Sequence, residues 1–197
     1  LVATLTENDS VRISVESGTT IAADSFEFQV DGAVYLRLTD TPGFQRSRQV
    51  LAWLQSAPDA EADRPARVRA FLAEPGHAER FPDEVALLAP IMAGSGILYV
   101  VDASQPVTAA DEAEMTILQW TGQPRMAVMN PMGVATLHSV WQPLLSGFFQ
   151  QVLLFNPLTA TPEQRLALLR SLGDLEPGWK KPLAALCERL VLRDHQR

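Results

Sequence analysis

The segment from Phe26 to Phe44 reads FEFQVDGAVYLRLTDTPGF and decides how the chain is interpreted. Its first part alternates apolar residues with polar neighbours, which is typical of a half-buried strand. The Asp31-Gly32 pair predicts a tight hairpin turn. A second apolar run over 34–38 predicts the partner strand. That strand delivers Asp40 at its carboxyl end, directly before Thr-Pro-Gly.

Downstream of the hairpin, apolar runs alternate with amphipathic stretches. Continuous apolar runs predict buried parallel strands over 97–101, 125–129 and 152–155. Apolar residues at helical spacing predict helices over 47–55, 65–72, 78–93, 109–121, 136–149, a helix capped by Thr161, and a last helix over 175–192. This order predicts an α/β fold whose mostly parallel sheet is covered on both faces, with the hairpin adding one antiparallel edge strand.

Composition narrows the class of protein. Of the 197 residues, 47% are apolar and 20% are charged, which is ordinary for a soluble globular protein. The formal net charge of −7 argues against a surface that binds nucleic acid through bulk charge, so no DNA partner is expected. A lone cysteine, Cys187, excludes an internal disulfide framework and favours a reducing cytoplasm. Apolar runs stay short of the roughly 20 residues of a membrane span, so none is expected.

The residues around the hairpin suggest phosphate and magnesium chemistry. Asp40 follows a strand end, where open α/β sheets bind ligands, and a carboxylate there can hold Mg²⁺. Gly43 has no side chain, so its amide can approach a phosphate closely. Thr20, in the loop that contains Gly18 and precedes the hairpin, could coordinate magnesium through its hydroxyl, and Thr19 is the alternative. A plain solvated loop is the competing interpretation of both threonines.

Ser17-Gly-Thr-Thr20, a hairpin and then Asp40-Thr-Pro-Gly43 resemble the Era/Der/TrmE-like branch of the translation-associated P-loop GTPases. The resemblance covers roughly Leu1 to Phe155. More specifically, the inserted Arg64–Phe81 segment and the altered motif at Asn130 resemble a bacterial group in which a GTPase domain is followed by a domain of unknown function. It implies a three-layer P-loop NTPase-like fold and a cytoplasmic hydrolase that binds Mg²⁺-GTP, hydrolyses it slowly and cycles with GDP. The resemblance implies nucleotide contacts by Thr19, Thr20, Asp40, Thr41, Pro42, Gly43 and Asn130, and magnesium ligation by Thr20 and Asp40. It assigns no catalytic residue, and it leaves a protein or ribosome partner unidentified.

The chain departs from that family at several motifs. The phosphate loop GxxxxGK[ST] is absent. In the family it precedes the helix whose last turn Leu1–Thr6 resembles, so we expect the loop and its strand upstream of a start that looks cut. Asn130-Pro-Met-Gly133 stands where the family reads guanine with Asn-Lys-x-Asp, which loses the lysine and the aspartate. Ile21 replaces the arginine of the Gly-Thr-Thr-Arg switch.

These observations divide the chain into a partial GTPase domain over 1–160 and C-terminal helices over 161–197, which are a candidate start of a following helical domain. We expect this fragment alone to bind nucleotide poorly and to be inactive. The first alternative is a pseudo-GTPase scaffold or interaction module whose base recognition has decayed. The second is an unrelated doubly wound α/β domain with a fortuitous Asp-Thr-Pro-Gly.

Several conspicuous side chains have simpler interpretations. Asn130 is as well explained by a turn before proline as by a base contact. Arg64, Arg67 and Arg69 are expected on a solvated charged face. The histidines show no ligand spacing, which favours structural or surface roles. Trp179 is expected either to pack or to mark an exposed contact.

Overall fold

The structure is a computed structural model that describes residues 24–30, 32–130, 137–156 and 158–194. Thr19, Thr20, Ile21 and the expected helix end at Leu1–Thr6 lie outside these ranges. The strands are β1 Asp24–Val30, β2 Ala33–Asp40, β3 Ile97–Asp102, β4 Arg125–Asn130 and β5 Gln151–Leu154. The helices are α2 Ser47–Gln55, α3 Arg64–Ala73, α4 His77–Arg80, α5 Pro82–Met92, α6 Ala109–Trp120, α7 His138–Phe148, α8 Pro162–Gly173 and α9 Pro177–Asp194.

The strands form two separate sheets. β1 and β2 pair antiparallel as the expected hairpin, with Asp24 opposite Asp40 and a bulge between Phe28 and Gln29. β3, β4 and β5 form a parallel sheet in that order. The predicted α/β class and parallel strands are therefore confirmed. Within the described residues the hairpin is not the edge of the parallel sheet, because β1 and β2 form a sheet of their own; residues of both β2 and β3 line a cavity.

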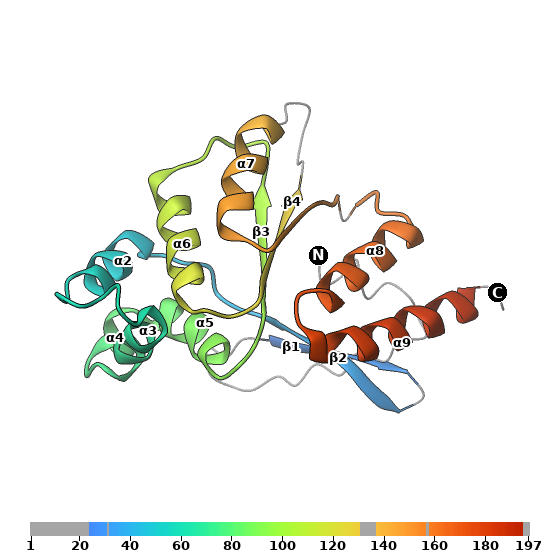
Figure 1. The fold of residues 1–197 in the computed structure, drawn as a ribbon, viewed down its shortest axis with the longest axis horizontal. Coiled ribbons are helices and arrows are strands. Elements are labelled where there is room, and N and C mark those ends of the chain that lie inside the picture. The colour runs from blue at the N-terminus through green and yellow to red at the C-terminus, as the bar shows by residue number, and fades with distance from the viewer. Residues whose placement is uncertain (1–23, 31, 131–136, 157, 195–197) are drawn as a thin grey trace.

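The central strand β4 shows how the parallel sheet is covered on both faces. Its successive side chains point to opposite faces, as the pleat requires. Ala127 and Met129 join a core cluster made with α2, α3, α5, α6 and α7. Met126 and Val128 join a second cluster made with Phe28 of β1 and with α8 and α9. In Figure 1, α6 and α7 accordingly lie on one side of β3 and β4, and α8 and α9 on the other.

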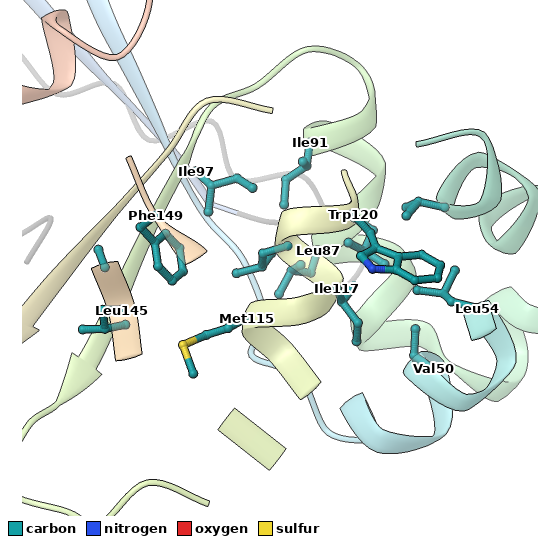
Figure 2. Packing of buried hydrophobic residues seen from close by; sticks show 14 of the residues in the cluster. Val50, Leu54, Leu87, Ile91, Ile97, Met115, Ile117, Trp120, Leu145 and Phe149 are labelled. Atoms are coloured by element: carbon teal, nitrogen blue, oxygen red, sulfur yellow. The ribbon is translucent and has the colours of Figure 1, made fainter. Parts of the chain in front are cut away.

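The first cluster is centred on α6. Figure 2 shows Trp120 and Ile117 of this helix beside Val50 and Leu54 of α2. A capping box starts α6: the Thr108 hydroxyl accepts the backbone N–H of Asp111, whose carboxylate accepts the N–H of Thr108. This reciprocal pairing satisfies amides that a helix start otherwise leaves unpaired.

The helix expected over 78–93 is two helices. Phe81 lies between α4 and α5 with φ −131° and ψ 54°, outside the helical region. The residue that follows it is Pro82, and a proline ring disfavours helical geometry in the preceding residue. Pro82 itself begins α5, where its missing N–H removes no helical hydrogen bond. The chain therefore turns at Phe81 instead of continuing.

An arginine holds helix α3 to α2, and a histidine holds α4 to α3. Arg67 donates to the carbonyls of Leu54 (2.9 Å) and Trp53 (2.7 Å), and its guanidinium lies 3.6 Å from the centroid of the Trp53 ring. The expectation that Arg67 belongs to a solvated face is wrong, because the last carbonyls of α2 need donors. His77 is buried against Phe71, with Nδ1 2.9 Å from the Phe71 carbonyl, which is a structural role.

In the described part of the chain, no helix combines the length and apolar character needed to cross a membrane.

Candidate functional site

A cavity of about 1260 Å³ lies between the hairpin and the parallel sheet. β2 from Tyr35 to Asp40 lines it, together with the segment Thr41–Phe44. β3 from Ile97 to Val100 lines it from the parallel sheet. Helices α5, α6 and α9 also contribute to the lining. The described residues thus enclose a space at the junction of two sheets, which is a common place for ligand sites.

The Asp-Thr-Pro-Gly motif opens onto this cavity. Asp40 ends β2 and is exposed, while Thr41 and Pro42 are half-buried and Gly43 is exposed. All four line the cavity, so the structure brings these sequence-predicted residues together at one wall. A tightly packed turn would bury its residues against the core instead.

Nothing in the described part of the chain requires position 43 to be glycine. A Cβ added there would meet no described atom within 4 Å, and the backbone of Gly43 is not in the left-handed region. Packing and backbone geometry therefore both permit a side chain at this position. A glycine that the fold does not require is consistent with a backbone N–H that something outside the described chain approaches closely.

Asn130 lies apart from the Asp40 motif. It ends β4 in register with Asp102 of β3, and its backbone carbonyl accepts the N–H of Ala103 at 3.0 Å. It does not line the cavity. Its side-chain oxygen Oδ1 is buried and has no hydrogen-bond partner among the described residues, a state that costs free energy in a folded protein. The following residues, Pro131 to Gly133, lie outside the described ranges.

Of the two predicted magnesium ligands, only Asp40 lies within the described residues. They contain no cluster of three or more histidine, cysteine or acidic residues suited to a metal ion. Mg²⁺ commonly uses only one or two protein carboxylates and takes its other ligands from phosphates and water. The exposed Asp40 carboxylate fits that limited requirement. Thr20, the other predicted ligand, lies outside the described ranges.

A buried carboxylate next to the motif was not predicted. Glu84 of α5 is 1% exposed, and its Oε1 accepts the backbone N–H groups of Gln45 (2.8 Å) and Arg46 (2.5 Å). Acidic residues are common in the first turn of a helix because they stabilise its dipole. The sequence around Glu84 therefore gave no reason to single it out.

A second unpredicted pair lies deeper in the cavity. Tyr99 of β3 donates its hydroxyl to Oε2 of Glu114 on α6 at 2.8 Å, and both residues line the cavity. Burial raises the pKa of Glu114, the nearby Asp111 raises it further, and the Tyr99 hydrogen bond lowers it. Burial also raises the pKa of Tyr99, with a contribution from the Glu114 charge. Such perturbed groups in a cavity are candidates for function.

The cavity therefore gathers Asp40, Thr41, Pro42 and Gly43 with Tyr99 and Glu114, and leaves Asn130 outside. Comparison with known proteins finds no protein-family model and no curated protein that matches the chain.

Proposed function

We propose that the chain carries the magnesium- and γ-phosphate-sensing part of a P-loop GTPase switch. The observation that carries the proposal is the placement of Asp40-Thr-Pro-Gly43 at the carboxyl end of β2, on the wall of a large cavity. The motif is accessible there, and its glycine is not explained by packing. The function proposed is binding of Mg²⁺-GTP followed by slow hydrolysis.

Each residue of the motif has a distinct role in this proposal. Asp40 holds the metal, usually through a coordinated water, and Thr20 supplies a hydroxyl ligand. Bound Mg²⁺ neutralises charge on the phosphate oxygens. Gly43 donates its backbone N–H to the γ-phosphate. Loss of that phosphate removes the contact and releases the loop, which is how nucleotide switches change conformation.

The phosphate cradle is assigned to sequence other than these 197 residues, because they contain no GxxxxGK[ST] motif. β3 supports this assignment. Its apolar run is typical of a strand covered on both sides, yet in the described part it pairs only with β4, and Val100 is 44% exposed. A further strand along the free side of β3 would lie between β3 and β2 and fill part of the cavity that both strands line, so the nucleotide would bind at the carboxyl ends of the strands, beside Asp40. The loop after such a strand would then open at the sheet edge that contains Asp102 and Asn130.

A pseudo-GTPase scaffold is the second candidate. Asn130 favours it, because the residue is followed by Pro-Met-Gly instead of Lys-x-Asp. Strong discrimination between bases needs paired polar contacts, and an isolated amide supplies few of them. A scaffold of this kind would keep the loop motif without selecting guanine.

The test is a titration with fluorescent GTP, GDP and ATP, with and without Mg²⁺. It should use the longest natural chain that contains these residues and, in parallel, the 197-residue chain. Gly43→Ala is the most informative variant. Its new methyl group meets nothing in the fold, so stability should be unchanged while GTP binding weakens and GDP binding persists. Asp59→Ala, at an exposed position outside the cavity, is the matched control for Asp40→Ala.

The outcomes separate the candidates. Magnesium-dependent GTP binding that Asp40→Ala abolishes supports the switch. Equal binding of GTP and ATP means that Asn130 does not select the base. Absence of nucleotide binding in the longest chain contradicts the GTPase and supports the scaffold.

A further inference from the structure

Glu84 occupies an unusual position for an acidic residue. It is 1% exposed, and it accepts two consecutive backbone N–H groups, those of Gln45 and Arg46, from a segment that is distant in sequence. A buried carboxylate is costly unless hydrogen bonds compensate for its lost hydration. The two amides provide that compensation. Glu84 is therefore tied to the segment that immediately follows the Asp40–Phe44 loop.

The Glu84 carboxylate lies beside the starts of two helices. Arg46 is the N-cap residue of α2, and Glu84 lies in the first turn of α5. Helix N-termini carry partial positive charge from their unpaired N–H groups. The carboxylate therefore lies between two helix starts and satisfies amides at one of them. Arg46 lacks a side-chain cap of its own, so Glu84 acts as a cap supplied from another helix.

Two further hydrogen bonds hold the same point of the chain. Nη1 of Arg46 donates to the carbonyl of Arg80 at the end of α4 (2.5 Å). The hydroxyl of Ser47 donates to the carbonyl of Ala110 in the first turn of α6 (3.2 Å). The start of α2 is thus fixed to three helices, and the carboxylate of Glu84 makes the most buried of these attachments.

This attachment limits how far the loop that carries the motif can move. β2 fixes Asp40 on one side, and Glu84 fixes Gln45 on the other. The residues between them, Thr41 to Phe44, can each extend the chain by at most about 3.6 Å. While Glu84 holds Gln45 and Arg46, the loop has little freedom to leave the cavity wall. If the attachment breaks, the start of α2 and the loop can move together.

We propose that Glu84 is a positioning residue that latches the Asp40–Phe44 loop to helix α5, and so sets the affinity of the site beside Asp40 for Mg²⁺-GTP. The regulatory part of this inference rests on the proposed function, whereas the latch itself does not. Coupling between two sites is reciprocal. A nucleotide that binds only the latched loop therefore protects the latch. Loss of the latch weakens nucleotide binding in proportion to the fall in the latched fraction.

The latch can be tested without nucleotide by limited trypsin digestion at two exposed arginines: Arg46, which is part of the attachment, and Arg48, which lies just beyond it. Glu84→Ala should accelerate cleavage at these sites at least about tenfold, because the amides of Gln45 and Arg46 both lose their acceptor. Glu84→Gln keeps an acceptor oxygen and should give an intermediate rate. Glu79→Ala, at an exposed position on α4, should cleave as the wild type does.

Cleavage at Arg170 of α8, an exposed position outside this region, reports global unfolding. The latch is overturned if cleavage at Arg170 rises in parallel with that at Arg46, or if Glu84→Ala leaves all rates unchanged. Should Glu84→Ala fail to fold, the intermediate rate of Glu84→Gln, compared with Glu79→Ala, decides the question.

Nucleotide binding forms the second arm, measured on the longest natural chain. The coupled account expects Glu84→Ala to weaken Mg²⁺-GTP binding by a measurable factor, at most the factor seen in cleavage, with partial recovery in Glu84→Gln. Bound GTP should also slow cleavage at Arg46. If cleavage responds to Glu84 but the wild type binds no nucleotide, the GTPase proposal fails while the latch stands. If the wild type binds GTP and Glu84→Ala binds it equally, the regulatory part is overturned.

Discussion

The carboxylate of Glu84 accepts the backbone N–H of Arg46 at 2.5 Å across 38 residues of sequence. This bond joins the first turn of α5 to the N-cap of α2. It connects the helices that follow α2 to the loop that carries the sequence motif. The position of that loop therefore depends on a residue far from it in the chain.

Removal of this carboxylate should reduce stability. In Glu84→Ala the amides of Gln45 and Arg46 lose their acceptor, and the free energy of unfolding should fall by about 2–3 kcal/mol. Glu84→Gln should lose less, since its amide oxygen can still accept. Urea unfolding of both variants beside Glu79→Ala measures the effect. Equal stability of Glu84→Ala and the wild type would contradict it.

Gly96 should not tolerate a side chain. A Cβ at this position would lie 2.1 Å from Cη2 of Trp179 and 3.3 Å from the carbonyl of Pro124. Gly96→Ala must displace the indole from the start of β3, and overpacking of this kind costs about 1–3 kcal/mol. Chemical denaturation measures the loss, and Trp179→Ala should relieve part of it in the double variant.

Gly147 provides the control for that experiment. It lies within α7, and an added Cβ would meet nothing within 4 Å. Gly147→Ala should leave stability unchanged or raise it by about 0.5–1 kcal/mol, since alanine favours helix. If Gly96→Ala behaves like Gly147→Ala, the contact between Gly96 and Trp179 does not constrain the fold.

Arg67 should not be replaceable by lysine. Its guanidinium donates to the carbonyls of Leu54 and Trp53 and stacks on the Trp53 ring, which a single ammonium cannot reproduce. Arg67→Lys should lower the melting temperature through a loss of about 1–2 kcal/mol. Arg69→Lys, at an exposed position on the same helix, should change nothing measurable. Matching losses in the two variants would indicate that Arg67 has no special role.

Glu114 should make stability depend on pH. Burial raises the pKa of its carboxyl in the folded chain above the ordinary value of 4.5. Between the two pKa values the folded state binds more protons than the unfolded state, so stability falls as pH rises through this window. Thermal unfolding at several pH values should show that the melting temperature of Glu114→Gln rises relative to that of the wild type as the pH increases above 4.5.

The Tyr99→Phe variant tests the Glu114 carboxyl by removing its hydrogen-bond donor. The Tyr99 hydrogen bond lowers the pKa of Glu114, so its removal should raise that pKa further and extend the loss of stability to higher pH. Parallel pH profiles for the wild type, Glu114→Gln and Tyr99→Phe would show that burial does not perturb this carboxyl.

The sequence predicted the elements whose patterning is local. β3 and β4 were recognisable because both are continuous apolar runs, and the structure pairs them in parallel. The hairpin followed from alternation around Asp31-Gly32. The break at Phe81 was missed although Pro82 marks it, because the apolar residues on both sides keep helical spacing. Separation of the hairpin from the parallel sheet depends on distant residues and could not be read from either strand.

The same distinction between local patterns and distant contacts applies to the candidate site. Asp40 and Gly43 were predicted because the motif is contiguous and follows a strand. Glu84 and Glu114 were missed because each acts through a partner from another element, Arg46 and Tyr99 respectively. Neither partner is marked by local spacing. Trp179 was left open between packing and an exposed contact, and the structure places its ring against Gly96.

The central claim is that Asp40 belongs to a magnesium-dependent GTP site. The most direct measurement is the dissociation constant of GTP, with and without Mg²⁺, for the longest natural chain containing these residues and for its Asp40→Ala variant. The account predicts that Mg²⁺ strengthens GTP binding in the wild type and that Asp40→Ala removes this gain, weakening Mg²⁺-GTP at least about tenfold. Binding that is absent, or that is identical in the two proteins, would contradict it.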